Sequence, residues 1–277
     1  MSVRTGVLPR WNSGSGSFNA CLGEGRKGEP VKKIKLVIVS VAKQVIQLTL
    51  QLLFPRRCPV CDRIVQPFGR KICPECRGRL KLVTPPWCMK CGKKLREERE
   101  LCADCRRETH VFLRGRSLYE YADAAPSIYR MKYGKRQEYA EFFGEEAAEH
   151  LAGFIREVHP DALIPIPLHK KRLRKRGYNQ AALLARVIGA SAGVPVYEKM
   201  MLRIKNTSPL KKQNPEERQN NLKKAFIIAQ NDVKLNTIII VDDIYTTGST
   251  IDEAARVWRA AGVPNVYFIA LACGAGV

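Results

Sequence analysis

A run of branched apolar residues that ends in two adjacent aspartates constrains the fold of this chain more than any other feature. Residues 238–250 read Ile-Ile-Ile-Val-Asp-Asp-Ile-Tyr-Thr-Thr-Gly-Ser-Thr. The unbroken run Ile238 to Val241 is typical of a strand covered on both faces, as in a parallel sheet. Apolar residues then recur at helical spacing: Ile251, Ala254, Ala255 and Trp258. The pattern predicts strand, turn and helix, with the turn at the carboxyl edge of the sheet, where open α/β sheets bind ligands.

The residues of this turn suit a sugar phosphate. The backbone N–H groups of Thr246 to Ser249 open the next helix, where unpaired donors and the helix dipole attract phosphate. Asp242 and Asp243 would repel a phosphate, so we expect them to bind vicinal ribose hydroxyls, directly or through a divalent cation. The segment lacks the Gly-Lys-Ser/Thr of a Walker A loop and the glycine spacing of a dinucleotide-binding turn. An ordinary strand with an Asp-rich helix cap is the alternative.

The whole thirteen-residue pattern resembles the phosphoribosyl pyrophosphate (PRPP) signature of type I phosphoribosyltransferases. The resemblance implies that Asp242 and Asp243 bind the ribose 2- and 3-hydroxyls and stabilise an oxocarbenium-like ribose, which makes them the candidate catalytic residues. It implies magnesium bound together with PRPP. The following loop would bind the 5-phosphate through Thr246, Thr247, Gly248, Ser249 and Thr250. Candidates to hold the pyrophosphate are Lys132, Arg174, Arg176 and Arg218.

Eight of the ten cysteines form four Cys-x-x-Cys pairs. The pairs are Cys58/Cys61, Cys73/Cys76, Cys88/Cys91 and Cys102/Cys105. Two such knuckles can close one tetrahedral zinc site, so the sequence predicts two structural zinc ions rather than disulfides. The stretch is poor in apolar residues, so metal would supply much of its folding free energy. Sequential pairing is preferred, and a cross-braced arrangement of first with third and second with fourth pairs also fits the spacing.

The charge of the chain indicates a polyanionic partner. The formal net charge is +22, and residues 1–109 carry 23 basic against 9 acidic side chains, a difference of +14. Nucleic acid is the first candidate and an anionic membrane surface the second, with compositional bias as the alternative. Residues 170–176 contain six basic side chains in seven positions. Candidate DNA-binding residues are Lys170, Lys171, Arg172, Arg174 and Lys175, with Tyr178 as a stacking surface.

The N-terminal part has a different character. Residues 1–33 are rich in Gly, Ser and charge, which predicts a disordered tail. Residues 34–55 predict an apolar helix, and Lys43 near its centre argues against stable membrane insertion. We expect this helix to pack on the zinc module or the main domain, with membrane attachment as the alternative. No cleavable secretory signal is evident and the other domain is typical of a cytosolic sugar-phosphate enzyme, so the expected location is cytoplasmic, with a peripheral position at the inner membrane face as a variant.

Strand and helix patterns alternate after the cysteines, which predicts an α/β domain with a mostly parallel sheet flanked by helices. Strands are expected over 111–121, 161–168, 225–228 and 266–271, and a loop over 201–222. The segment Ile128 to Gly134 is expected to precede a helix. The expected organisation is a tail over 1–33, a helix over 34–55, a double zinc ribbon over 56–109 and a phosphoribosyltransferase-like domain over 110–277.

Taken in order along the chain, these motifs resemble the ComF (ComFC) family of competence-associated, phosphoribosyltransferase-like proteins. The motifs are the four knuckles, Lys132-Tyr133-Gly134, Pro165-Ile166-Pro167-Leu168, Arg176-Gly177-Tyr178-Asn179-Gln180, Arg218 with Asn221, and the PRPP signature. The resemblance implies a role in natural transformation, handling incoming single-stranded DNA in the cytoplasm. It also implies that Pro165–Leu168 lies near the pyrophosphate and that 207–222 closes over it.

Two other functions fit the same sequence. One is a PRPP-dependent transferase that acts on a free nucleobase or amine and has no DNA role. The other is a non-catalytic zinc adaptor that docks a competence helicase or another DNA-processing protein. No residue pattern identifies an acceptor substrate.

Overall fold

The computed structural model describes residues 49, 53–67, 69–205, 225–229 and 233–275. The chain forms two compact units, Met1–Phe54 and Pro55–Val277, and every element discussed below belongs to the second. The expected tail, nearly all of the expected helix 34–55, Arg218 and the expected closing loop 207–222 lie outside the described residues. Among the helices that are described, none is both long and apolar enough to cross a membrane.

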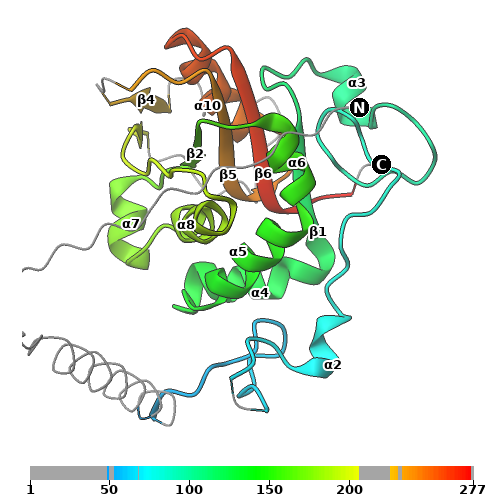
Figure 1. Cartoon of the computed structure of the whole chain (residues 1–277), viewed down its shortest axis with the longest axis vertical. Helices are drawn as coiled ribbons and strands as arrows, with labels where there is room; N and C mark the ends of the chain where they lie inside the picture. The colour runs from blue at the N-terminus through cyan, green and yellow to red at the C-terminus, as the bar shows by residue number, and fades with distance from the viewer. Residues whose placement is uncertain (1–48, 50–52, 68, 206–224, 230–232, 276–277) are drawn as a thin grey trace, which may run out of the picture. The chain divides into compact units, whose positions relative to one another are not determined.

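A four-stranded parallel sheet forms the centre of the second unit, in the order β1-β6-β5-β2. Its strands are β1 (Gly115–Glu120), β2 (Ala162–Pro165), β5 (Thr237–Tyr245) and β6 (Asn265–Cys273) (Figure 1). Val241 of β5 lies opposite Pro165 on one side and Ile269 on the other. The expected parallel sheet is confirmed, and β5 is one of its two interior strands.

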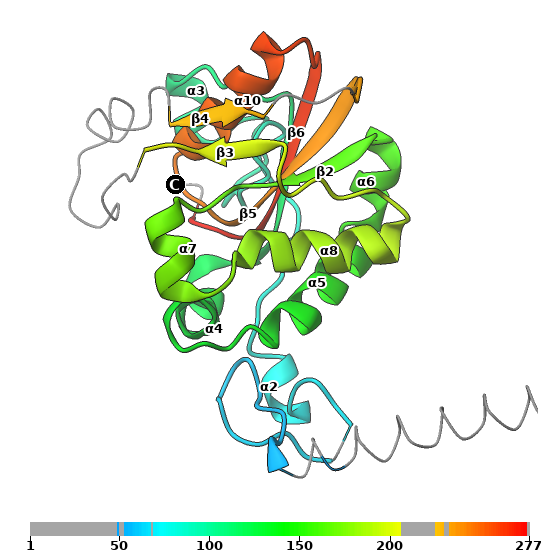
Figure 2. The same ribbon diagram turned by 90° about the vertical axis from the view of Figure 1, so that its left-hand side faces the viewer.

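Successive residues of β5 point to opposite faces of the sheet, and both faces are covered. Ile239 and Val241 are buried against a layer of four helices, whereas Ile238 and Ile240 are buried on the opposite face. The four-helix layer consists of α4 (Tyr121–Tyr133), α5 (Tyr139–His150), α6 (Ala152–Val158) and α8 (Gln180–Ala192). The other face carries α10 (Ser249–Ala260) and the antiparallel pair β3 (Met201–Arg203) and β4 (Phe226–Ile228) (Figure 2). This double coverage explains why the strand is apolar at every position from Ile238 to Val241.

Several elements differ from the expected boundaries. β5 does not end at Val241 but continues through Tyr245, because β6 pairs with it along that whole length. The strand expected over 111–121 covers only Gly115–Glu120, and α4 begins immediately after it. Residues 128–133 form the end of α4 rather than a lead-in to a helix. Residues 201–203 form β3, which is antiparallel to β4 and separate from the main sheet, and Lys170–Arg176 forms a short helix, α7.

The cysteine-rich segment forms two modules, and their buried residues join two different hydrophobic cores of the second unit. The first ribbon, residues 56–80 with α2 (Pro74–Arg77), adds Val65 and Ile72 to the core of the four-helix layer. The second ribbon, residues 86–107 with α3 (Ala103–Arg107), adds Leu95 to the core around α10.

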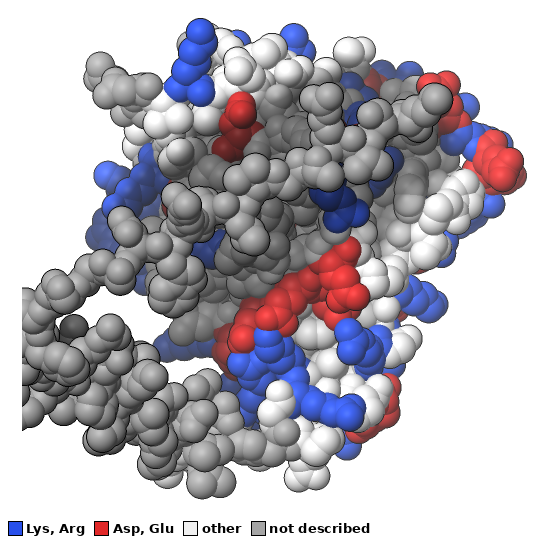
Figure 3. Space-filling view, viewed as in Figure 1, with Lys and Arg blue, Asp and Glu red and all other residues white. Residues whose placement is uncertain are grey.

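Ion pairs also hold the first ribbon to α5. Figure 3 shows a band of acidic side chains over α5, bordered by basic side chains. Lys71 Nζ lies 2.9 Å from Glu141 Oε1 and also pairs with Glu145, while Arg77 Nη2 lies 2.6 Å from Glu146 Oε1. The ribbon and α5 therefore share both a core and a charged border.

Candidate functional site

The two candidate catalytic carboxylates lie at the carboxyl end of β5 and point to opposite faces of the sheet. Asp243 lies on the same side of β5 as Ile239 and Val241, toward the four-helix layer. Asp242 lies on the same side as Ile240, toward β3. The backbone N–H of Asp243 donates to Asp242 Oδ1 at 2.8 Å. The pair therefore offers carboxylate oxygens on two sides of the strand.

Asp243 is buried and fully engaged by two helices. It is 5 % exposed, and its Oδ1 lies 2.7 Å from Nζ of Lys132 on α4. Its Oδ2 accepts a hydrogen bond from the amide of Gln180, the first residue of α8. Lys132, expected to hold pyrophosphate, is thus placed against a carboxylate in this structure. Gln180 is only the last residue of one sequence motif, and no spacing rule pointed to its contact with Asp243.

Asp242 sits in a half-buried position that disfavours its charged form. Burial, and next the neighbouring charge of Asp243, raise the pKa of Asp242 to about 7, against smaller opposing effects of Lys132 and Arg203. Carboxyl groups whose pKa is shifted toward neutral pH occur often at functional sites.

The candidate phosphate loop begins α10 as expected. Gly248 is the N-terminal cap, with φ 87°, and the N–H groups after it open the helix. A Cβ at Gly248 would lie 2.7 Å from Tyr245 Oη and 2.9 Å from His110 Cε1, so only glycine fits the conformation and the space. Thr247 Oγ1 and Ser249 Oγ lie 2.9 Å apart, and Thr246 is exposed.

The start of α10 is held in place by a contact that no sequence motif indicated. Asp252, in the first turn of α10, accepts the backbone N–H of Val111 at 2.8 Å, and its Oδ2 lies 2.7 Å from His110 Nδ1. His110 stacks on Phe112 at 4.8 Å between ring centroids. The segment that follows the second ribbon thus holds the start of α10, and no local pattern around His110 indicated it.

The basic segment forms α7, which follows the Pro165–Leu168 loop. His169 caps its start, and Gly177 ends it in a left-handed conformation. Lys170, Lys171, Arg174 and Lys175 are exposed, and none of these four forms an ion pair with an acidic side chain among the described residues. Arg172 and Arg176 are half-buried.

Arg176 and Tyr178 turn toward the carboxylate site rather than away from the protein. Arg176 donates to Gln180 Oε1, and its guanidinium lies 5.4 Å from the ring centroid of Tyr133. The hydroxyl of Tyr178 donates to the carbonyl of Met131, and burial raises the pKa of Tyr178. Tyr178 is half-buried, and its hydroxyl is tied to α4 at a position where we expected a stacking surface.

The cysteines gather into two sets of four, Cys58, Cys61, Cys73 and Cys76 and then Cys88, Cys91, Cys102 and Cys105. In each set the Sγ atoms lie within 4.8 Å of one another. Pairs from different knuckles approach to 3.9 Å in the first set and 3.7 Å in the second. Four sulfurs at about 2.3 Å from one zinc stand about 3.8 Å apart, so both sets fit a tetrahedral ion. The grouping is sequential, and the cross-braced alternative is wrong.

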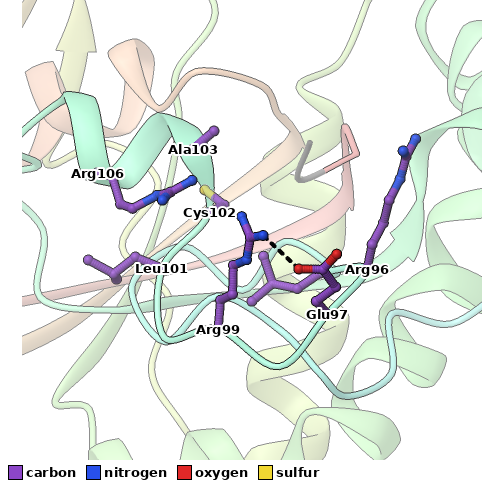
Figure 4. A pocket seen from close by; sticks show the side chains of 8 residues that line it. Arg96, Glu97, Arg99, Leu101, Cys102, Ala103 and Arg106 are labelled. Atoms are coloured by element: carbon purple, nitrogen blue, oxygen red, sulfur yellow. Dashed lines mark hydrogen bonds and ion pairs between the residues drawn. The ribbon is translucent and has the colours of Figure 1, made fainter.

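A small pocket of about 120 Å³ lies on the second ribbon. Arg96, Arg99 and Arg106 surround it together with Leu95 and Leu101, and Arg99 pairs with Glu97 at its rim (Figure 4). It shares no residue with the carboxylate site or the loop after it.

Comparisons with known proteins relate the chain to a zinc ribbon domain and to competence and DNA utilization proteins. A family model described as a double zinc ribbon domain matches residues 49–106. Competence protein F of Haemophilus influenzae is 27% identical over 228 residues, covering 79% of this chain and 97% of that protein. DNA utilization protein YhgH of Escherichia coli K12 is 26% identical over 216 residues, covering 76% and 94%. A purine phosphoribosyltransferase structure from Pyrococcus horikoshii aligns at 18% identity with a TM-score of 0.30, over 48% of this chain and 73% of that one.

Competence protein ComFC of Bacillus subtilis is 31% identical over 196 residues, which cover 67% of this chain and 77% of that protein. The matched ribbon domain accounts for both cysteine sets. The chain therefore belongs to the ComF (ComFC) family of competence proteins.

Proposed function

We propose that this protein binds magnesium–PRPP at the carboxyl end of β5 and takes part in DNA uptake by handling incoming single-stranded DNA in the cytoplasm. The observation that carries the proposal is the junction of β5 and α10. There Asp242 and Asp243 stand just before a helix start that Gly248 caps and hydroxyl side chains line. Carboxylates suit ribose hydroxyls, and the unpaired N–H groups of the helix start suit the 5-phosphate.

The same geometry supports transfer of a phosphoribosyl group. In that reaction the bond between the anomeric carbon and the pyrophosphate oxygen breaks, pyrophosphate leaves with the electron pair, and an acceptor supplies the pair for the new bond. Magnesium bound with PRPP would stabilise the charge of the leaving group. In this proposal Asp242 and Asp243 would face the positive charge that develops on the ribose, and charges placed in this way stabilise a transition state.

The relatives support the DNA part of the proposal. Their names refer to competence and to DNA utilization. In this chain the exposed basic side chains of α7 follow β2, the strand that neighbours β5, so a phosphate backbone bound there would pass close to the PRPP site.

Calorimetry with magnesium–PRPP tests the proposal. Thr247→Ala removes a hydroxyl from the candidate phosphate loop without touching the core, and we expect PRPP affinity to fall about tenfold, the effect of one hydrogen bond to a charged group. Thr237→Ala is the matched control, because Thr237 begins the same strand at its opposite end. Equal PRPP affinity in both variants and the unchanged protein would contradict the loop assignment. Pyrophosphate release, measured with and without single-stranded DNA, then tests transfer.

A further inference from the structure

Two tyrosines on α4 leave large parts of their rings in solvent beside the carboxylate site. Tyr129 is 59% exposed and Tyr133 is 61% exposed. They stand four residues apart, on one face of the helix, and their ring centroids lie 4.9 Å apart at an interplanar angle of 48°. Exposed aromatic rings paired in this way are costly to leave in water, and they offer flat surfaces for another ring.

The aromatic pair is joined to both parts of the proposed site. Lys132, next to Tyr133 in sequence, points inward and pairs with Asp243. The guanidinium of Arg176, the last residue of α7, lies 5.4 Å from the Tyr133 ring centroid and donates to Gln180, which in turn donates to Asp243. The C-terminal half of α4 thus directs Lys132 to Asp243 on one side and the two rings to solvent on the other.

Charge beside the rings favours a nucleic acid strand over other aromatic ligands. α7 lies next to the C-terminal half of α4 (Figure 2), where Arg176 of α7 contacts the ring of Tyr133 and Tyr178, just after α7, donates to the carbonyl of Met131. The exposed cations of α7 are Lys170, Lys171, Arg174 and Lys175. Single-stranded DNA is bound by just this combination, in which a basic track follows the backbone and aromatic rings stack the bases.

We infer that Tyr129 and Tyr133 form a platform on which bases of a single DNA strand stack while α7 contacts its phosphates. The inference rests on the DNA part of the proposed function and specifies the residues that hold the bases. It replaces Tyr178, whose hydroxyl is tied to α4, as the stacking surface.

The test uses the full chain and two oligonucleotides with the same number of phosphates, one carrying 2-aminopurine and the other abasic. Stacking quenches 2-aminopurine fluorescence, so we expect quenching with the unchanged protein and tighter binding of the strand that carries bases. Tyr129→Ala combined with Tyr133→Ala should abolish the quenching and weaken binding roughly 5- to 100-fold, since stacking of one base contributes an affinity of that order. The salt dependence should stay the same, because the phosphate contacts remain.

Two control variants test whether the effect depends on the position of the tyrosines and on the aromatic ring. Tyr121→Ala makes the same change at the other end of α4 and should leave binding unchanged. Tyr133→Phe keeps the ring and should retain the quenching. Equal affinity and quenching in the double alanine variant would overturn the platform while leaving DNA binding intact. Quenching of free 2-aminopurine riboside as strong as that of the strand would overturn the assignment to DNA. An unchanged protein that binds PRPP but neither oligonucleotide would overturn the DNA part of the proposed function and the platform with it.

Discussion

At the scale of single residues, the two adjacent aspartates have opposite environments despite identical chemistry. Asp243 has a cation and an amide as partners, whereas burial and the charge of Asp243 keep the pKa of Asp242 at about 7. The alternation of strand side chains explains this difference. In the sequence the two aspartates look equivalent, because the apolar run ends at Val241 and a residue beyond a strand has no assigned face.

Asp242 should therefore cost stability at neutral and alkaline pH. Its folded-state pKa lies above the unfolded value of about 3.9, so the folded chain holds the extra proton between these values, and the free energy of unfolding falls as pH rises from about 4 through 7. Asp242→Asn should raise the thermal midpoint at pH 8 by about 2–4 °C for each kcal/mol recovered, with no gain at pH 4. It should also lose PRPP binding, as expected of a destabilising functional residue.

Asp161 provides a control for that measurement, because its pKa is shifted in the opposite direction from that of Asp242. Its carboxylate accepts the N–H groups of Asn236 at 2.7 Å and Thr237 at 2.9 Å, and these hydrogen bonds lower the pKa of Asp161. Its stabilising effect is therefore present above the unfolded pKa and is lost as pH falls through the folded pKa. Asp161→Asn should lower the midpoint at pH 8. A drop in the midpoint for Asp242→Asn as well would contradict the electrostatic cost assigned to the ionised Asp242.

At the scale of elements, α7 concentrates positive charge on a single short helix. Like charges three and four residues apart destabilise a helix, although Arg174, Lys175 and Arg176 interact favourably with the negative end of its dipole. The exposed members are Lys170, Lys171, Arg174 and Lys175. Replacing all four with alanine should stabilise the helix and lower the affinity for DNA. The slope of log affinity against log salt should fall by roughly 0.7 for each phosphate that the variant no longer neutralises.

A second variant with the same change in net charge distinguishes the effect of the charges on α7 from the effect of the overall net charge. It replaces the exposed arginines Arg96, Arg99, Arg106 and Arg107 of the second ribbon with alanine. We expect it to retain most of the salt slope. Equal losses in the two variants would mean that overall charge, rather than α7, attracts the strand.

The elements also mark the limit of prediction from sequence. The β5–α10 junction and both cysteine sets were predictable, because strand periodicity and ligand spacing are local patterns. The contacts of Gln180 with Asp243 and of His110 with Asp252 join residues 63 and 142 positions apart. Such contacts depend on which helix covers which strand, and periodicity does not specify that. The exposed faces of Tyr129 and Tyr133 were missed because the segment was not assigned to a helix.

At the scale of the whole second unit, each ribbon supports a different part of the proposed site. The first ribbon holds α4, because Arg130 Nη1 donates to the carbonyls of Pro59 at 3.2 Å and Val60 at 3.0 Å. The second ribbon lies against β1, where Gly115 N–H donates to the carbonyl of Lys90 at 2.9 Å. It also reaches Tyr245, since Lys93 Nζ lies 5.6 Å from that ring centroid. We therefore expect the aromatic pair to depend on the first ribbon and the candidate phosphate loop to depend on the second.

Removing one ligand from each ribbon should therefore affect PRPP and oligonucleotide binding differently. Cys61 and Cys105 are the half-buried members of their sets, so Cys61→Ser and Cys105→Ser are matched changes. Metal analysis should find two zinc ions in the unchanged protein and in Cys273→Ser, whose cysteine lies on β6 outside both sets, and one in each ribbon variant.

Cys61→Ser should weaken oligonucleotide binding more than PRPP binding, because α4 loses its support. Cys105→Ser should weaken PRPP binding more, because Tyr245 packs against Gly248 of the candidate phosphate loop. Equal weakening of both kinds of binding in both variants would mean that the ribbons stabilise the unit as a whole and do not divide the site between them.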